Sequence, residues 1–274
     1  MTPQFSIIIP THNRADGRLQ RALDSIVVQT HRDFECIVVD DGSTDGTYKV
    51  VLEYLIHDRR QQMEMETPVK LDLPEHCAEH LRGGRFHYVR HEKNQGRVVA
   101  RNTGMNASVG NWLLWTDSDD ALDQMYLASA AYHIEQEPSA RVFIVGAITH
   151  GMATRMEGKE KIHICPVWTK IRQCWIPPVN SDGVHDHFNS GKIGSGSFIF
   201  ARECYEHIGP MPPWKTCYDI ADGCNEWLEY ETPYSARKKW CGNPFGDDWV
   251  YVRRLSQFYL FHPIHAALYI QYIR

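Results

Sequence analysis

The sequence lacks any apolar run long enough to cross a membrane. Its most apolar stretch, Phe258–Ile273, is interrupted by His262, Pro263, His265 and Gln271, whereas a spanning helix needs about 20 consecutive apolar residues. The N-terminus also lacks a basic segment followed by a long apolar core, which is the pattern of a signal peptide. We therefore expect a cytoplasmic protein with no membrane span.

The chain also lacks an excess of positive charge. Its 29 Lys and Arg residues stand against 34 Asp and Glu, a formal net charge of −5, whereas proteins that follow phosphate backbones usually show the opposite imbalance. The eight cysteines form no CxxC pair and no zinc-ribbon spacing. Nucleic acid is therefore not indicated as a partner, and we expect free thiols.

What the first 150 residues do contain is a repeated alternation of strand and helix patterns. Continuous apolar runs such as FSIIIP and FECIVV are typical of strands that are buried on both faces of a parallel sheet. Strands are predicted at 5–10, 34–39, 86–89, 112–116 and 142–147, and helices at 16–29, from 44 or 45 onwards, at 98–108 and at 123–137. This alternation predicts an α/β fold with a doubly wound, mostly parallel sheet, whose ligands bind at the carboxyl ends of the strands.

The remaining segments have weaker patterns. Residues 58–84 are predicted to be an insertion with at most one short helix near 75–81, and residues 150–192 show no clear period. Further on, the sequence predicts a strand at 197–201, a helix at 247–257 and a weak final strand at 266–273.

Acidic residues directly follow two of the predicted strands. Asp40 and Asp41 end one strand, and Asp117, Asp119 and Asp120 follow another, so both groups should project from the ligand-binding edge of the sheet. A single Asp in such a place often caps the next helix, but three close carboxylates repel each other unless a cation or hydrogen-bond donors satisfy them. Oxygen ligands of this kind suit Mg²⁺ or Mn²⁺ bound together with substrate phosphates.

No GxxxxGK[ST] and no GxGxxG occurs in the first strand–helix turn, so the P-loop and Rossmann interpretations lack their phosphate-binding backbone. The segments FSIIIPTHNR, FECIVVDDGSTDGT, NQG with ARNTG, and WTDSDD instead resemble, in order, the pattern of glycosyltransferase family 2 on the GT-A fold. The resemblance covers residues 5 to about 150.

The resemblance implies roles for particular residues. In that family the end of the first strand and the acidic pair after the second strand hold the base and ribose of the nucleotide. The implied nucleotide-binding residues are Pro10, Thr11, Asn13, Arg14, Asp41, Arg101 and Asp117. Asp119, with Asp117, is implied to bind the Mn²⁺ or Mg²⁺ that bridges the diphosphate. The alternatives are a surface ion pair for Arg101 and a helix N-cap for Asp120.

The segment GDDWVYVR, which begins at Gly246, resembles the corresponding part of spore-coat polysaccharide synthase-type glycosyltransferases. There an Asp at the start of a helix deprotonates the acceptor hydroxyl, which implies Asp247 or Asp248 as the catalytic base. Alignment on Gly246 and Arg253 favours Asp247, whereas alignment on Trp249 selects Asp248. Successive helical residues are turned by about 100°, so only one of the two can face the site.

The second half of the chain also contains tryptophans and histidines whose role the sequence leaves open. Six tryptophans suggest an aromatic acceptor pocket: Trp168, Trp175, Trp214, Trp227, Trp240 and Trp249. Core packing is the alternative for each of them. An additional metal ligand at His262 or His265 is a further, weaker hypothesis.

These observations predict a metal-dependent glycosyltransferase that moves a sugar from a nucleoside-diphosphate sugar to a hydroxyl acceptor, with inversion. We expect residues 1–150 to form the nucleotide-sugar-binding half, with the insertion at 58–84, and residues 151–274 to form the acceptor-binding half of the same GT-A domain. UDP is the favoured nucleotide, although thymine and guanine also offer an N–H to Asp41. A retaining transferase and a catalytically inactive nucleotide-sugar-binding module remain as alternatives.

Overall fold

Four parallel strands form the centre of the sheet in the computed structural model. The structure describes residues 2–63, 81–157, 160–172, 179, 196–211 and 247–273. The central strands lie in the order β4 (Phe86–Arg90), β2 (Phe34–Asp40), β1 (Phe5–Thr11) and β5 (Trp112–Trp115). Every residue of β1 and β2 is buried, as their continuous apolar runs predict.

The other half of the sheet is mixed. Its strands are β9 (Phe198–Ala201), β7 (Val142–Glu157), β10 (Phe261–Ile273), β6 (Ala121–Leu122) and β8 (Glu160–Arg172). Strand β9 runs antiparallel to both β5 and β7, and β10 is parallel to β7. The described strands thus form one ten-stranded sheet, with β3 (Leu81–Gly83) at the far edge beside β4.

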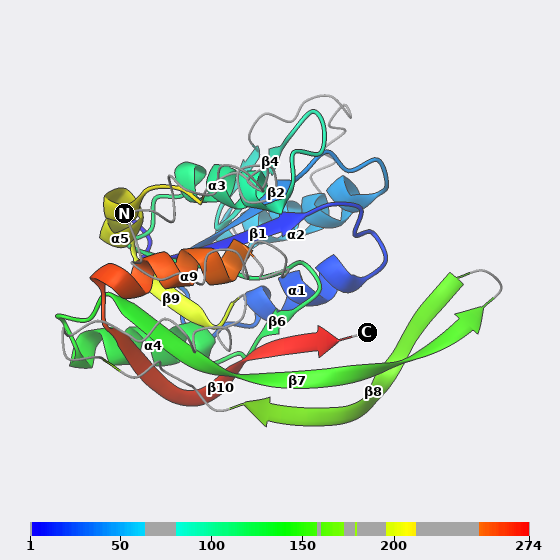
Figure 1. Cartoon of the computed structure of the whole chain (residues 1–274). Coiled ribbons are helices and arrows are strands. Elements are labelled where there is room, and N and C mark those ends of the chain that lie inside the picture. The colour runs from blue at the N-terminus through cyan, green and yellow to red at the C-terminus, as the bar shows by residue number, and fades with distance from the viewer. Residues whose placement is uncertain are drawn as a thin grey trace, which may run out of the picture.

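Helices cover both faces of this sheet (Figure 1). They are α1 (Arg18–Val27), α2 (Thr47–Met63), α3 (Arg97–Ala107), α4 (Tyr126–Gln136), α5 (Arg202–Ile208) and α9 (Asp247–Phe258). Because strand side chains alternate, Ile7 and Ile9 pack in a core with residues of α1, α2 and α4, whereas Ile8 packs in a second core with residues of α3, α5 and α9. The predicted α/β doubly wound architecture is therefore confirmed.

Helix α3 lies unusually close to the sheet at Gly104. A Cβ atom at this position would lie 2.4 Å from Cγ2 of Ile8 in β1. A glycine is therefore required here by packing, since real Cβ contacts are longer than this. The glycine of the ARNTG segment thus sets the distance between α3 and the strand whose carboxyl end borders the site.

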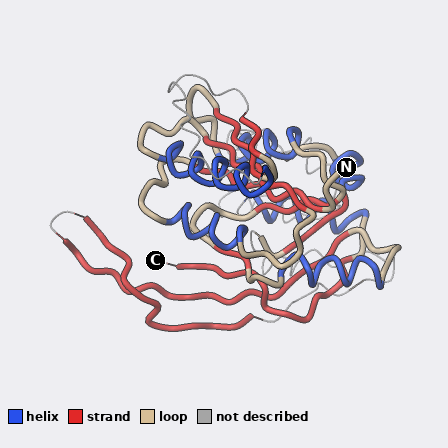
Figure 2. Tube along the Cα trace, turned by 180° about the vertical axis from the view of Figure 1, so that it is seen from behind, coloured by secondary structure: helices blue, strands red, loops and turns tan. Residues whose placement is uncertain are grey.

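Residues 150–192 show no clear period in the sequence, but the structure forms strands there as far as Arg172. Strands β7 and β8 form a long antiparallel hairpin that projects from the body of the molecule (Figures 1 and 2). Register shifts interrupt β7 between Gly151 and Met152 and between Met152 and Thr154. Such bulges break the period of two on which recognition of a strand depends. Strand β10 has shifts of the same kind and begins five residues before its predicted start.

The structure forms regular elements at both ends of the segment 58–84, where an insertion was predicted. Helix α2 continues to Met63, and β3 pairs with β4 from Leu81. Residues 64–80, which include most of the helix predicted near 75–81, lie outside the described residues.

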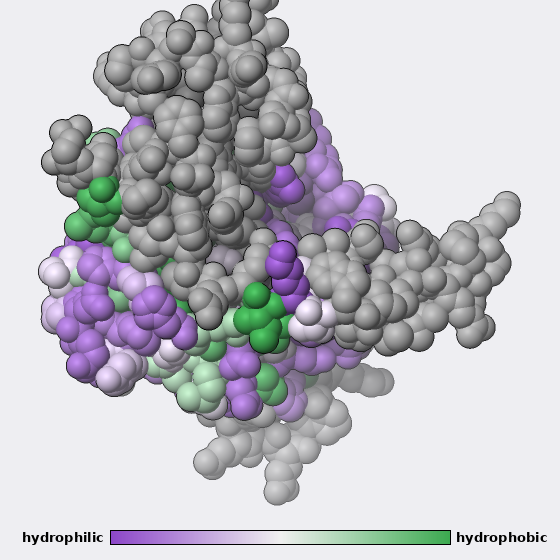
Figure 3. Space-filling view, turned by 60° about the horizontal axis from the view of Figure 1, so that its bottom comes forward, coloured by the Kyte–Doolittle hydropathy of each residue, from purple (hydrophilic) through white to green (hydrophobic). Residues whose placement is uncertain are grey.

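The coloured residues on the face shown in Figure 3 are mostly hydrophilic. On the face turned forward in Figure 3, hydrophobic residues form small separate groups among hydrophilic ones, which is normal for a folded protein. Within the described part of the chain, no helix is both long and apolar enough to cross a membrane.

Candidate active site

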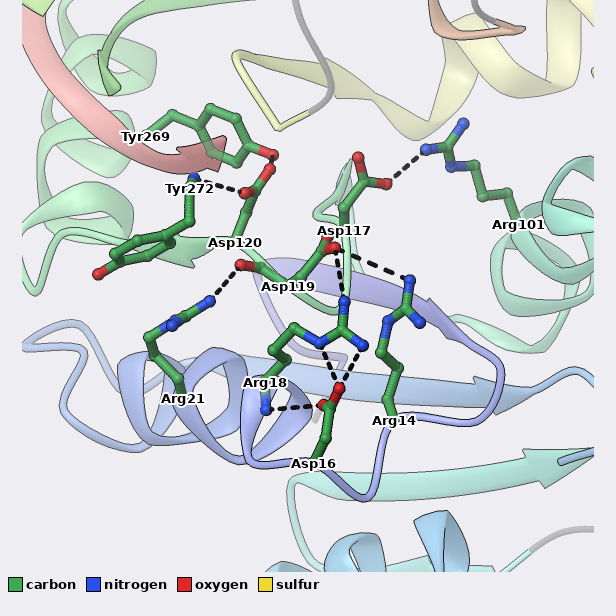
Figure 4. Close-up of polar contacts among 10 residues, drawn as sticks. All are labelled: Arg14, Asp16, Arg18, Arg21, Arg101, Asp117, Asp119, Asp120, Tyr269 and Tyr272. Atoms are coloured by element: carbon green, nitrogen blue, oxygen red, sulfur yellow. Dashed lines mark hydrogen bonds and ion pairs between the residues drawn. The ribbon is translucent and has the colours of Figure 1, made fainter. Parts of the chain in front are cut away.

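The acidic segment after β5 lies beside the loop that leaves β1. The backbone N–H of Thr116 donates to the carbonyl of Ile8 at 3.0 Å, which continues the parallel pairing of the two strands. From there Asp117, Asp119 and Asp120 face residues of three other elements: α3, the N-terminal part of α1, and β10 (Figure 4). Because β1 and β5 are parallel, their carboxyl ends meet at one edge of the sheet, and the three acids lie together there as predicted.

Asp117 is held by a buried arginine. Nη2 of Arg101 donates to Oδ1 of Asp117 at 2.8 Å, and the guanidinium lies 5.4 Å from the ring of Trp115. Arg101 has no exposed side-chain surface, whereas the Asp117 side chain is 34% exposed. The alternative of a surface ion pair for Arg101 is therefore wrong, because its side chain is buried. A buried charge of this kind depends on its partner, which here is Asp117.

Asp119 faces a group of arginines. Nη2 of Arg14 and Nη1 of Arg18 each lie 3.8 Å from Oδ2 of Asp119. Nη2 of Arg21 donates to the backbone carbonyl of Asp119 at 2.7 Å, and its guanidinium stacks 3.7 Å from the ring of Tyr272. Sequence analysis singled out Arg14 but missed Arg18 and Arg21, although their spacing of three places them on one face of a helix.

Asp120 is buried and bound to the last strand. Its Oδ2 accepts a short hydrogen bond from the Tyr269 hydroxyl, and its Oδ1 accepts from the backbone N–H of Tyr272 at 3.0 Å. Burial, with the nearby charges of Asp117 and Asp119, raises the pKa of Asp120 to about 7. The alternative of a helix N-cap is wrong, because β6 follows Asp120 and α4 begins only at Tyr126. Sequence analysis missed Tyr269 and Tyr272, since nothing local links residues 149 and 152 positions apart.

The acidic pair after β2 is already hydrogen-bonded. Oδ1 of Asp41 contacts Nδ1 of His91 at 2.7 Å and accepts from the Gln95 N–H at 2.8 Å, while Oδ2 accepts from the Gly96 N–H at 2.7 Å. An ionised carboxylate has about four acceptor positions, so about one remains on Asp41. Asp40 accepts from Tyr88 and from the Ser43 N–H.

The first loop is fixed against the second. The backbone N–H of Asn13 donates to Ser43 at 2.9 Å, and Oδ1 of Asn13 accepts from the Thr44 N–H at 2.9 Å. Asn13 has a φ of 51°, a left-handed conformation that Asn tolerates better than most residues. The backbone N–H of Arg14 donates to Thr47 at 2.8 Å. These hydrogen bonds join the loop after β1 to the loop after β2, and the two loops together form the rim of the site.

The end of β1 also carries a buried hydroxyl. Pro10 and Thr11 are both buried, and Oγ1 of Thr11 finds no hydrogen-bond partner among the residues that the structure describes. Buried polar atoms are nearly always satisfied. The orphaned oxygen thus lies at the strand end where the nucleotide is expected.

Helix α9 begins at Asp247, close to its predicted start. The side chains of Asp247 and Asp248 lie outside the described residues, but Tyr251, one turn further on, packs with its ring centroid 5.4 Å from that of Trp115. Since Trp115 is the last residue of β5, the first turn of α9 lies near the strand end that carries Asp117.

Two other expectations have different outcomes. His262 contacts Glu137, which follows α4, and not the acidic segment. The side chains of the six tryptophans proposed for an acceptor pocket lie outside the described residues.

The residues present fit a divalent cation held together with a substrate. Asp117 and Asp119 supply carboxylate oxygens, and their side chains are 34% and 28% exposed. Among the described residues no cluster of three potential metal ligands occurs. Mg²⁺ nevertheless commonly uses one or two carboxylates and takes its other ligands from water and substrate phosphates, so two aspartates are sufficient.

A sheet of this topology with an Asp-x-Asp segment after its fourth parallel strand defines the GT-A class of fold. Comparison with solved structures confirms that class. S. aureus TarS residues 1–349 in complex with UDP-GlcNAc superposes with a TM-score of 0.60 at 18% identity, covering 100% of this chain and 59% of that chain. The complex with UDP gives 0.58 at the same identity, covering 100% and 61%.

The family follows from sequence comparison. A model described as "Glycosyl transferase family 2" matches residues 6–63 and 71–189, and the chain belongs to this family. Glycosyltransferase GlyA of Streptococcus pneumoniae is 32% identical over 124 residues, which are 45% of this chain and 14% of GlyA. A PGL/p-HBAD biosynthesis glycosyltransferase of Mycobacterium tuberculosis is 36% identical over 143 residues, 52% of this chain and 46% of that protein. The chain thus spans less than half the length of these curated relatives.

Proposed function

We propose that this chain is a metal-dependent glycosyltransferase that transfers a sugar from a UDP-sugar to a hydroxyl acceptor with inversion. The observation that carries the proposal is the Asp117-x-Asp119 segment, which leaves β5 beside the β1 loop. Arg101 donates to Asp117, Arg21 of α1 donates to the backbone carbonyl of Asp119, and Arg14 of the loop and Arg18 of α1 face the Asp119 carboxylate. Residues 1–150 would supply the donor side and residues 151–274 the acceptor side, although strand β7 crosses that boundary.

The donor assignment is supported by the rim of the site. One acceptor position remains on Asp41, and an N–H of the base, such as N3–H of uracil, could donate to it. Thr11 offers the hydroxyl that lacks a partner among the described residues. The similar TarS structures contain UDP and UDP-GlcNAc, which favours UDP over nucleotides with thymine or guanine.

The residues divide the chemistry between them. Asp119 and Asp117 would hold Mn²⁺ or Mg²⁺, which offsets the charge that develops on the departing nucleoside diphosphate. Arg101 fixes one oxygen of Asp117 and leaves the other free to turn towards a ligand. Asp247 or Asp248, at the start of α9, would remove the proton from the acceptor hydroxyl. An inverting reaction needs such a base, and the packing of Tyr251 on Trp115, which brings the start of α9 towards the end of β5, supports this assignment.

Calorimetric titration of UDP, with and without Mn²⁺, tests the proposal. We expect binding that depends on Mn²⁺ in the parent chain and its loss in Asp119→Ala, because the cation bridges carboxylate and diphosphate. Asp123→Ala, four positions on at a half-buried site, is the matched control and should bind normally. Binding that is equally tight without Mn²⁺, or unchanged in Asp119→Ala, would overturn the metal assignment.

Product analysis separates the alternatives. Release of UDP from a UDP-sugar excludes an inactive binding module, and the anomeric configuration of the product by NMR distinguishes inversion from retention.

A further inference from the structure

Two consecutive residues of α3 hold different parts of the molecule. Arg101 donates to Asp117, whereas the side chain of Asn102 contacts the segment after α5. Its Nδ2 donates to the carbonyl of Met211 at 2.8 Å, and its Oδ1 accepts from the Met211 N–H at 2.9 Å. The amide of Asn102 thus satisfies both backbone groups of a residue 109 positions away. Asn102 belongs to the ARNTG segment, but sequence analysis gave it no role.

The segment that this amide holds is the turn that ends α5. Gly209 follows the helix with a φ of 76°, a conformation that favours glycine, and its N–H donates to the Tyr205 carbonyl at 2.8 Å. Met211 is 1% exposed and packs in the same core as Tyr251 of α9. The Tyr251 hydroxyl also donates to the Gly209 carbonyl at 3.4 Å. The 209–211 turn therefore contacts both α3 and α9, which lie with α5 on one face of the sheet (Figure 1).

The position of Tyr251 fixes the start of α9. The helix begins at Asp247, and four residues make about one helical turn, so contacts that hold Tyr251 also hold the first turn. The ring of Tyr251 packs on Trp115 as well, with the two centroids 5.4 Å apart. The first turn of α9 is therefore supported by the end of β5 and by the 209–211 turn.

The contacts of α3 thus relate the two sides of the site to each other. Because Arg101 and Asn102 are neighbours in one continuous helix, the residue that holds Asp117 and the residue that holds the support of α9 keep a fixed spacing. Catalysis by proximity is sensitive to such spacing, since a misplacement of about 1 Å can cost about 100-fold in rate.

We propose that Asn102 is a positioning residue for the catalytic base, because it holds the 209–211 turn on which the first turn of α9 rests. The inference rests on the proposed function and deepens it. In this role Asn102 touches no reacting atom. It acts through Met211 and Tyr251 on the aspartate of α9 that removes the proton from the acceptor hydroxyl.

Kinetics with UDP-glucose and UDP-N-acetylglucosamine, with Mn²⁺ present and water as the acceptor, test this role. We expect Asn102→Ala to lower kcat for UDP release by about 10- to 100-fold and to leave the calorimetric affinity for UDP unchanged. Asn106→Ala is the matched control, since Asn106 lies on the same face of α3 and accepts from the Tyr205 hydroxyl of α5 at 2.5 Å. This contact does not involve the 209–211 turn, so the control should keep both kcat and affinity.

A double-mutant cycle distinguishes positioning from a general loss of structure. The second change is Asp247→Asn, or Asp248→Asn if that variant is the one that loses activity. If Asn102 acts through the base, Asn102→Ala should lower kcat by less than about twofold once the base has been removed, because no base is left to misplace. The same factor in both backgrounds, an unchanged kcat in Asn102→Ala, or a fall in UDP affinity as large as the fall in kcat would each overturn the proposal.

Native-state hydrogen exchange, followed by mass spectrometry, needs no activity and keeps the two proposals distinguishable. Asn102→Ala should speed the exchange of amides in the 209–211 turn and in the first turns of α9, and leave exchange in α1 unchanged. A parent chain that neither binds UDP nor releases it from either substrate would refute the proposed function. Unchanged exchange in α9 would instead overturn the link from Asn102 to the base, whatever the activity of the parent.

Discussion

Replacement of Asp120 by Asn should remove a pH-dependent loss of stability. The carboxyl is 3% exposed, and its pKa is raised from 3.8 to about 7, first by burial and then by the charges of Asp117 and Asp119. The folded chain therefore binds this proton more tightly than the unfolded chain does. Its stabilising effect is complete at low pH and falls as the pH rises from about 4 to about 7.

The magnitude follows from the two pKa values. Each pH unit between them corresponds to about 1.36 kcal/mol, so full ionisation of Asp120 costs about 4 kcal/mol as an upper limit. Between pH 5 and pH 8 the expected change is about 3 kcal/mol. Asn cannot ionise and keeps a carbonyl oxygen as acceptor for Tyr269 or Tyr272. The variant should therefore gain about 3 kcal/mol relative to the parent over this range.

Denaturant unfolding in EDTA, followed by tryptophan fluorescence at several pH values, measures this difference. EDTA is needed because a cation on Asp117 and Asp119 would favour the ionised form of Asp120. Asp123→Asn makes the same change of charge at a half-buried position and corrects for general electrostatics. A parent–variant difference that stays constant within about 0.5 kcal/mol from pH 5 to pH 8 would refute the reasoning.

Two further changes test other parts of the structure. Gly104→Ala should destabilise the chain by about 1–3 kcal/mol in denaturant unfolding, because the clash of its Cβ with Ile8 outweighs the roughly 1 kcal/mol by which Ala is favoured in a helix; an increase in stability would contradict the close approach of α3. Asp247→Asn should lower kcat by about 10²- to 10⁴-fold and leave the affinity for UDP unchanged; full activity in this variant, with the loss appearing in Asp248→Asn, would assign the base to Asp248.

The sequence predicted the parallel half of the fold accurately because burial on both faces leaves a local signal. Strands β1, β2 and β5 are continuous apolar runs, and each matches its predicted bounds to within one residue. Strands β7, β8 and β10 leave a weaker signal: the sequence predicts β7 only over 142–147, β10 only over 266–273 and β8 not at all. Bulges interrupt the registers of these strands and break the period of two on which their recognition depends. Local pattern therefore predicted the centre of the sheet and missed its long antiparallel hairpin.

The residues of the site were likewise predicted only in part. Asp117, Asp119 and Asp120 could be placed from sequence because each follows a strand end, and the family resemblance supplied Arg101. The residues that hold them came only from the structure. Tyr269 contacts Asp120 across 149 positions, and Arg21 reaches the carbonyl of Asp119 across 98. Long-range contacts of this kind depend on the whole fold, so no local sequence pattern identifies them.

Tyr269 also links the donor side of the site to the turn before β9. A Cβ on Gly196 would lie 2.1 Å from the Tyr269 ring, and the carbonyl of Gly196 accepts from the Tyr126 hydroxyl at 2.7 Å. Since the Tyr269 hydroxyl binds Asp120, any shift of this turn must move the ring and with it the residue that follows Asp119. The position of the acidic segment therefore depends on strands from both halves of the chain, and a fragment that ends near residue 150 should not hold Asp117 and Asp119 in their observed geometry.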